Sequence, residues 1–172
     1  MWWKVGKNIY LCNRILYKDV CMRFLGNIEA KTDAKGRAFL PAIFRKVLQA
    51  SGEENLVLRK DVFQKCLVLY PESVWNGRLD MLKNQLRPWE PTHQQMFRQF
   101  VSEAEVVNLD GNGRFLISKR LQKAADIEQD IQFIGMDDTI EIWTPQNLKL
   151  TLKSEEDFGN EFEQIMNSDT TL

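Results

Sequence analysis

Histidine and cysteine are scarce in this 172-residue chain, which contains one histidine and three cysteines. The cysteines, Cys12, Cys21 and Cys66, are scattered, and no pair has the spacing of a metal site. His93 has no acid or nucleophile at a recognisable catalytic spacing. These absences predict reduced thiols in a cytoplasmic protein that is not an enzyme and that has no metal, cofactor or small-molecule ligand.

Long hydrophobic runs and a strong net charge are absent as well. No apolar stretch approaches the ~20 residues that span a bilayer, so no membrane contact is expected. The formal net charge of −1 argues against non-specific nucleic-acid binding. Yet residues 22–65 carry nine Lys/Arg against five Asp/Glu, whereas residues 153–172 carry one against six. This asymmetry fits a basic working surface and an acidic tail, although a merely solvated acidic helix explains the tail equally well.

The first 21 residues differ from the rest of the chain. They show no clear helix or strand period, and polar residues interrupt their apolar stretch. No small-residue cleavage site follows them, which disfavours a signal peptide. Organised sequence begins at Met22, which could itself be a start. We interpret residues 1–21 as a non-native or disordered N-terminal extension from an upstream start.

An internal repeat organises the remainder. The segment Asp33-Ala34-Lys35-Gly36-Arg37 returns 77 residues later as Asp110-Gly111-Asn112-Gly113-Arg114. Further along, residues 66–70 resemble residues 139–143 at an offset of 73. A loop shortened by four residues explains the difference between the offsets. We therefore interpret the chain as a tandem duplication.

Both repeats predict the same order of elements. A strand leads into the Asp–Gly turn and a second strand leaves it, because Asp first and Gly fourth favour a type I turn closed by a bulge. A helix follows, begun by Pro41 in the first repeat and capped by Ser118 in the second. A hairpin and a short helix, starting at Pro71 or Pro145, complete each unit. The expected strands are 24–31, 37–40, 56–59, 66–70, 105–109, 114–117, 131–134 and 139–143.

Two helices are expected between the repeats. The first has one apolar face, formed by Trp75, Leu79, Leu82 and Leu86, and the segment 87–91 with its two prolines breaks it. Thr92 and Gln95 then resemble a capping box. It opens a second helix whose inward face we expect to be Met96, Phe97, Phe100 and Val101.

Two features of the helical segments remain. His93 lies in the first turn of the second connecting helix, where we expect solvated surface. A last helix carries Phe158, Phe162, Ile165 and Met166 on one face, and we expect that face to dock on a core or on a neighbour.

The D-x-x-G-R turns suggest two alternative roles for their arginines. The aspartate that opens the turn can orient the guanidinium, whose planar fork suits phosphate oxygens or a guanine edge. Lys35 at the turn tip adds a charge for the phosphate backbone. Alternatively, the pairs Asp33–Arg37 and Asp110–Arg114 are internal salt bridges that only brace the turns. The residues alone support both interpretations.

The duplicated motif resembles that of the MraZ family of bacterial transcription regulators. The first copy continues as Phe39-Leu40-Pro41-Ala42-x-Phe44-Arg45, and the second is followed by Ile140-Glu141-Ile142-Trp143. The intervening Tyr70-Pro71 and Trp75 add to the match, which covers Met22 to about Trp143. Ser118 departs from the pattern, since the first repeat has proline there, so the resemblance carries over less directly to the second turn.

The resemblance implies an α+β fold in which duplicated swapped-hairpin AbrB-type β units form a barrel-like body with peripheral helices. It divides the chain into repeat 1 (26–75), a helical connector (76–103), repeat 2 (104–148) and an acidic C-terminal helix or tail (149–172). It implies a nucleoid-associated repressor of the division and cell-wall gene cluster. Such a regulator binds direct repeats of promoter DNA as a ring-shaped homo-oligomer. The implied DNA-binding residues are Asp33, Lys35, Arg37, Asp110 and Arg114.

Three other functions compete with this interpretation. An AbrB-type antitoxin would use the acidic tail against a toxin, but such antitoxins usually carry one repeat per chain. A structural ring protein would keep the Asp–Arg pairs as braces without binding DNA. An enzyme on a duplicated β barrel would need a phosphate loop, a metal site or a paired histidine, and the sequence offers none of these patterns.

Overall fold

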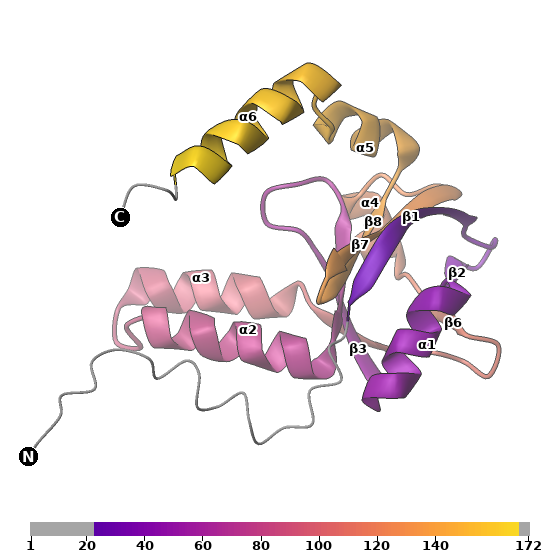
Figure 1. The fold of residues 1–172 in the computed structure, drawn as a ribbon. Helices are drawn as coiled ribbons and strands as arrows, with labels where there is room; N and C mark the ends of the chain where they lie inside the picture. The colour runs from indigo at the N-terminus through magenta and orange to yellow at the C-terminus, as the bar shows by residue number, and fades with distance from the viewer. Residues whose placement is uncertain (1–22, 169–172) are drawn as a thin grey trace, which may run out of the picture.

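The computed structural model describes residues 23–168, so the interpretation of residues 1–21 lies outside the described part (Figure 1). Eight strands occur in chain order: β1 (Phe24–Lys31), β2 (Arg37–Phe39), β3 (Asn55–Lys60), β4 (Leu67–Pro71), β5 (Glu105–Asn108), β6 (Arg114–Leu116), β7 (Asp130–Asp137) and β8 (Thr139–Trp143). Six helices accompany them: α1 (Ala42–Ser51), α2 (Glu72–Gln85), α3 (Pro91–Ser102), α4 (Lys119–Ala124), α5 (Pro145–Thr151) and α6 (Glu155–Ser168). The expected α+β class is confirmed.

The strands form two antiparallel sheets. The larger has six strands in the order β1-β7-β8-β4-β3-β5, and the smaller pairs β2 with β6. The first strand of each repeat therefore pairs with the third strand of the other, β1 with β7 and β5 with β3. Each half of the chain completes the sheet of the other half.

The strand pairing repeats itself about an internal twofold axis. The order reads the same from the other end of the large sheet when each strand is replaced by its counterpart in the other repeat, β1 by β5, β3 by β7 and β4 by β8. The register follows the same symmetry, because Val68 pairs with Glu141 at the centre of the large sheet. Ala38 pairs with Phe115, 77 positions on, at the centre of the small sheet. The duplication seen in the sequence is thus accompanied by an internal symmetry of the strands.

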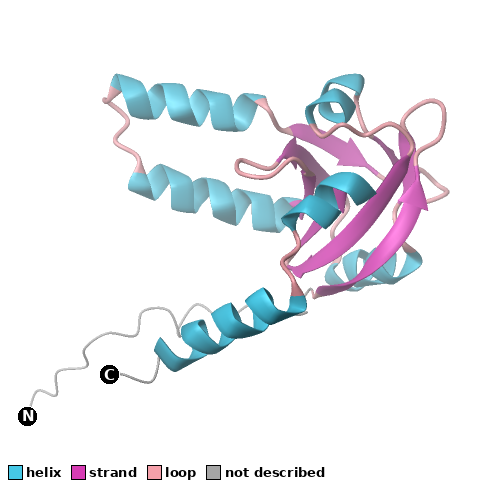
Figure 2. Ribbon diagram, turned by 90° about the horizontal axis from the view of Figure 1, so that it is seen from above, coloured by secondary structure: helices cyan, strands magenta, loops and turns pink. Residues whose placement is uncertain are grey.

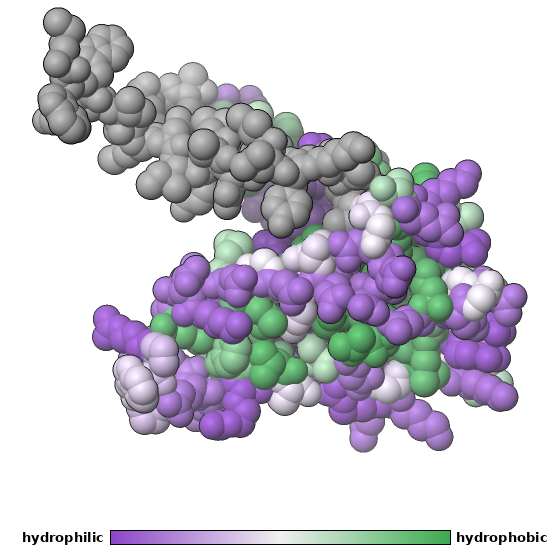
Figure 3. All heavy atoms as spheres, turned by 90° about the horizontal axis from the view of Figure 1, so that it is seen from below, coloured by the Kyte–Doolittle hydropathy of each residue, from purple (hydrophilic) through white to green (hydrophobic). Residues whose placement is uncertain are grey.

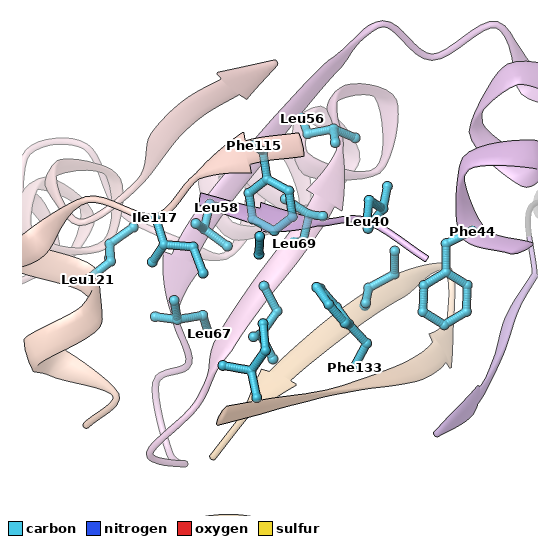
Figure 4. Close-up of a cluster of buried hydrophobic side chains, with 14 of the residues drawn as sticks. Leu40, Phe44, Leu56, Leu58, Leu67, Leu69, Phe115, Ile117, Leu121 and Phe133 are labelled. Atoms are coloured by element: carbon cyan, nitrogen blue, oxygen red, sulfur yellow. The ribbon is translucent and has the colours of Figure 1, made fainter. Parts of the chain in front are cut away.

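One hydrophobic core lies between the two sheets and the short helices. Both repeats contribute to it, and its largest members are almost completely buried (Figure 4). Phe44 of α1 meets Phe24 edge-on with ring centroids 5.7 Å apart, and Phe115 meets Phe133 at 6.3 Å. The labelled residues in Figure 4 come from β3, β4, β6, β7, α4 and the α1 region. Side chains from the strands supply most of this core.

The helices lie around the sheets. Helices α2 and α3 run side by side and project from the sheet as a long hairpin, while α1 lies beside β2 and β6 (Figures 1 and 2). Trp75 holds the base of this hairpin, because its ring stacks on Phe100 at 5.5 Å and contacts Tyr70 at 5.3 Å. None of the helices within residues 23–168 is long and apolar enough to cross a membrane.

The barrel-like body expected from the resemblance is not closed. In residues 23–168 the six-stranded sheet ends at β1 on one side and at β5 on the other. The short strands β2 and β6 pair with each other across the internal axis instead of bridging these two edges. They have three residues each, and only the isolated bridge between Thr32 and Ala38 links β2 to the end of β1.

Several local expectations also differ from the structure. The capping box at Thr92 is wrong, because α3 begins at Pro91 with Glu90 as its N-cap and no side-chain cap. Pro41 is the N-cap of α1, one position before the helix. His93 is not merely solvated, since its Nδ1 accepts the backbone N–H of Arg87 at 2.9 Å. The cap at Ser118 is confirmed, because its hydroxyl accepts the N–H of Leu121 at 3.3 Å.

Two apolar helix faces are more exposed than expected. Met96 of α3 was expected to point inward but is 48% exposed. The apolar face of α6 does not dock on the core, because every described side chain from Glu155 to Asn167 is exposed. Hydrophobic side chains also gather in patches among hydrophilic ones on the face seen from below (Figure 3). Within residues 23–168 a considerable apolar surface is therefore exposed.

Candidate nucleic-acid interface

The two D-x-x-G-R segments form nearly identical turns. In the first, the N–H of Gly36 donates to the carbonyl of Asp33 at 2.9 Å, and the N–H of Asp33 donates to the carbonyl of Arg37 at 2.8 Å. Gly36 and Gly113 have φ angles of 80° and 79°. Because L side chains rarely adopt such angles, glycine is required at the fourth turn position. The turn type predicted from the sequence is confirmed.

The aspartate of each turn holds both the backbone and the arginine. Asp33 Oδ1 accepts the N–H groups of Lys35 and Arg37, each at 2.9 Å. Its Oδ2 lies 2.8 Å from Nε and 2.7 Å from Nη2 of Arg37. The second turn repeats this pairing, with Asp110 Oδ2 at 2.8 Å from both Nε and Nη2 of Arg114. No residue of the described chain accepts a hydrogen bond from Nη1 of either arginine.

These hydrogen bonds stabilise the ionised carboxylates. The N–H of Arg37 and then its guanidinium lower the pKa of Asp33 to about 2. The backbone and side chain of Arg114 lower the pKa of Asp110 to about 2 in the same way. Both pairs are therefore fully charged at neutral pH.

A pH titration should report this depression. The folded-state pKa values lie below the unfolded value of about 3.9, so the stability that the pairs contribute is complete above about pH 4 and is lost as the pH falls through 2. Carboxyl chemical shifts of Asp33 and Asp110 should give midpoints near 2 in the folded protein. Arg37→Ala should raise the pKa of Asp33 only in part, because the backbone N–H remains. A midpoint near 4 in the unmodified protein would contradict the pairing.

Each turn is locked by the opposite repeat. The N–H of Leu40 donates to the carbonyl of Gly113 at 3.0 Å, and the N–H of Ile117 donates to the carbonyl of Gly36 at 2.9 Å. Two side chains at equivalent positions close over the turns: Arg45 lies against Gly113 and Gln122 against Gly36. The two turns thus have fixed positions relative to each other.

Strands β2 and β6 place both arginines on one exposed surface, which we call the ribbon face. It comprises Arg37, Phe39, Arg114 and Leu116, since Ala38 and Phe115 point to the core. Arg37 pairs with Leu116 and Phe39 with Arg114 across the ladder. The guanidinium of Arg114 lies 5.6 Å from the centre of the Phe39 ring. Phe39 and Leu116 remain 56% and 53% exposed.

The five residues predicted for the site lie in or beside the two turns, which precede β2 and β6 at opposite ends of the two-stranded ribbon. Lys35 and its counterpart Asn112 are exposed at the two turn tips, beside the ribbon face. The sequence analysis missed Phe39 and Leu116 as surface residues. The period of two in a strand could have identified them, because Phe39 and Leu116 each lie two places after a turn arginine and therefore face the same side as that arginine.

Metal-ligating and nucleophilic side chains elsewhere in the described chain form no comparable arrangement. No cluster of three or more His, Cys, Asp or Glu side chains suited to a metal ion occurs in residues 23–168. Burial raises the pKa of the Cys66 thiol far above its usual value, so the sulfur stays protonated and weakly nucleophilic.

The fold and site define a class of α+β proteins in which two intertwined β repeats present paired arginine turns. The family model described as "MraZ protein, putative antitoxin-like" matches residues 100–168. A protein of Phocaeicola vulgatus named "Transcriptional regulator MraZ" is 59% identical over 88% of this chain and 98% of its own length. Proteins with the same name from Bacteroides thetaiotaomicron and Flavobacterium psychrophilum are 55% and 32% identical, over 86% and 83% of this chain and 95% and 90% of their own lengths. The chain belongs to the MraZ family.

Proposed function

We propose that this chain is a sequence-specific DNA-binding transcriptional regulator that contacts DNA through the ribbon face. The observation that carries the proposal is the register of β2 and β6, which puts Arg37 and Arg114 on one exposed surface. Asp33 and Asp110 complete the site by holding the two arginines, and Lys35 completes it by contacting phosphate. The names of its relatives, transcriptional regulators, support the same assignment.

The dimensions of the ribbon suit duplex DNA. Three residues per strand extend roughly 10 Å, and the major groove of B-DNA, about 12 Å wide, accepts a two-stranded ribbon. Each aspartate takes up Nε and Nη2 of its arginine, so the guanidinium is held in one orientation before DNA arrives. Such a held fork can bind a guanine edge or a phosphate with little loss of side-chain freedom.

The remaining parts of the proposal extend the family resemblance. The two repeats are a duplicated pair of swapped-hairpin units, which the exchange of β1 and β5 between the halves supports. Several subunits assemble into a ring and bind direct repeats of promoter DNA in the cytoplasm, on the nucleoid. The regulated genes are the division and cell-wall cluster, and the outcome is repression. A ring offsets the weak charge of one subunit, because linked contacts bind with a high effective concentration.

Direct binding tests the proposal. The probe is a labelled duplex carrying the region upstream of this chain's own gene, compared with a shuffled duplex of equal composition. Fluorescence anisotropy at fixed salt should give an affinity about 1,000-fold higher for the native duplex. Equal affinity for the two duplexes would reject sequence-specific binding.

Lys35→Gln should weaken binding to both duplexes by a similar factor, because a turn-tip lysine contacts phosphate and not bases. The slope of log affinity against log salt should fall by about 1 per engaged turn. Lys149→Gln is the matched control, since Lys149 is an exposed lysine of α5, which lies away from the ribbon face. If both substitutions act alike, Lys35 contributes only to the overall charge.

A further inference from the structure

Helix α6 has an apolar face that no described part of the chain covers. Phe158, Phe162 and Met166 follow at intervals of four residues and are 61%, 56% and 58% exposed. The two phenylalanine rings contact each other at 6.0 Å. The helix is also acidic, with five carboxylates and no basic residue between Glu155 and Ser168. An isolated helix of 14 residues is marginal in water, so a docking partner would stabilise it.

A groove on the same chain has the complementary character. It is a hollow of about 360 Å³ between α3 and the β3–β4 loop, lined chiefly by Arg59, Lys60, Val62, Met96, Phe100 and Glu103. Its rim is apolar and exposed, since Val62 is 54%, Met96 48% and the adjacent Phe63 89% exposed. We call this hollow the α3 groove. Three exposed apolar side chains around one hollow form an anchor site for an amphipathic helix.

The floor of the α3 groove holds an arginine with incomplete hydrogen bonding. Arg59 is 3% exposed, and its Nε has no hydrogen-bond partner. Its guanidinium lies 4.1 Å above the Phe100 ring, and its Nη2 reaches Glu103 only at 3.4 Å. A buried donor without an acceptor is costly. A carboxylate entering the groove could reach this cation.

The charges favour α6 in the groove over two α6 helices paired together. Residues 59–66 carry Arg59, Lys60 and Lys65 against Asp61 alone, and the carboxylate of Asp61 already accepts N–H groups of its own loop. Helix α3 adds Arg98 and no acidic residue. Pairing two α6 helices would bring ten carboxylates together without a cation. The lining itself is balanced, with Arg59 and Lys60 against Asp61 and Glu103, and Arg98 and Lys65 lie in the segments that form it. A second α6 would offer carboxylates alone, so the groove suits the acidic helix better.

From these features we infer that α6 of one copy docks in the α3 groove of a second copy. The inference rests on the proposed assembly of subunits and specifies the contact that holds it. The two surfaces are different patches of the same chain, so the contact is head-to-tail and leaves one helix and one groove open at the ends of any linear assembly. Such a contact produces a ring when its rotation closes.

Two single substitutions test the contact. Phe162→Asp places a charge on the apolar face of α6, and Met96→Asp places one at the rim of the groove. Each should weaken self-association about 30-fold or more, measured by sedimentation and native mass spectrometry, because each removes a central anchor. Asn160→Asp on the other side of α6 and Asn84→Asp on α2 add the same charge at exposed positions outside both surfaces and should leave the assembly unchanged.

Mixing the two defective variants gives the sharpest result. The Met96→Asp chain retains an intact α6 and the Phe162→Asp chain an intact groove, so an equimolar mixture should form a one-to-one dimer and nothing larger. If Met96→Asp still assembles fully while Phe162→Asp does not, α6 binds elsewhere or pairs with itself, and the inference is overturned. Full assembly of both variants overturns it as well.

The unmodified chain separates this inference from the proposed function. A monomeric wild-type chain would overturn both the ring and the contact, whereas an assembled wild type with unaffected variants would overturn the contact alone. Binding of the upstream duplex is measured on the same samples. When Lys35→Gln is added to a dissociated variant, it should still lower the slope of log affinity against log salt, because the ribbon face is intact in each subunit.

Discussion

Replacing Arg37 by alanine should weaken binding to the upstream duplex by roughly 5- to 150-fold per engaged subunit, the equivalent of 1–3 kcal/mol for a bidentate contact. A ring that engages several repeats should show a larger total loss, since each subunit contributes. The fold should survive, because Arg37 lies on the exposed ribbon face and its partner Asp33 is partly exposed. Anisotropy titrations at fixed salt, with thermal melts of the same samples, measure both effects.

Two further substitutions refine this expectation. Arg37→Lys keeps the charge but loses the planar fork, so it should recover phosphate-type binding without recovering sequence preference. Arg114→Ala should reduce affinity less than Arg37→Ala, because its turn carries Asn112 where the first carries Lys35. Asp33→Ala should reduce both stability and affinity, since Asp33 holds the turn backbone as well as the arginine.

The brace interpretation expects the opposite pattern. If Arg37 only braces its turn, Arg37→Ala melts early and still binds DNA wherever it remains folded. The contact surface expected in that case is formed by Arg45 and Lys46 of α1. Arg45 already lies over Gly113 and donates from Nη1 to the carbonyl of Asn112 at 3.4 Å. Substituting Lys46, which is exposed, would then become the informative experiment.

The largest loss of stability is expected at Phe133. This residue of β7 is fully buried and packs against Phe115 at the meeting point of the two repeats. Phe133→Ala should lower the free energy of unfolding by about 3–5 kcal/mol, because it removes the ring and leaves a cavity. For a chain of this size the melting temperature should fall by roughly 10 °C or more. Thermal denaturation followed by circular dichroism measures the shift.

Phe39→Ala provides the matched control for this loss. The same substitution on the exposed ribbon face should change the free energy of unfolding by less than about 0.5 kcal/mol. It should nevertheless reduce DNA affinity, since Phe39 flanks Arg114 and would contact the groove. Equal destabilisation by the two substitutions would show that the ribbon face is part of the core, contrary to its exposure.

Local sequence patterns predicted the repeated turns, strands and helices well because those elements depend on near neighbours. Asp33 and Gly36 define their turn within five residues, and the cap at Ser118 involves only the following helical turn. The capping box at Thr92 failed because Pro91 already supplies a favoured first helical residue, which moves the start of α3 one position earlier. When two helix-start signals lie one residue apart, the sequence pattern alone does not show which of them begins the helix.

The arrangement of the sheets and exposed faces depended on distant contacts. Phe39 carries the same apolar signal as a core residue, and its outward position becomes clear once β2 is seen to pair with β6 and to bury Ala38. Met96 belongs to an apolar helix face, yet it is 48% exposed at the rim of the α3 groove. The large sheet is open because β2 and β6 pair with each other in a separate sheet. The residues of these two strands do not by themselves predict that pairing.

The exchange of first strands between the halves has an evolutionary consequence. Because β1 completes the hairpin of the second half and β5 that of the first, neither half has all of its own partners. Severed halves would therefore be expected to fold only after recombining with each other. Within one polypeptide the two turn tips can also differ, as Lys35 and Asn112 do, whereas two identical chains must accept every change twice. The β2–β6 ribbon thus has one charged end and one neutral end on a frame that both ends share.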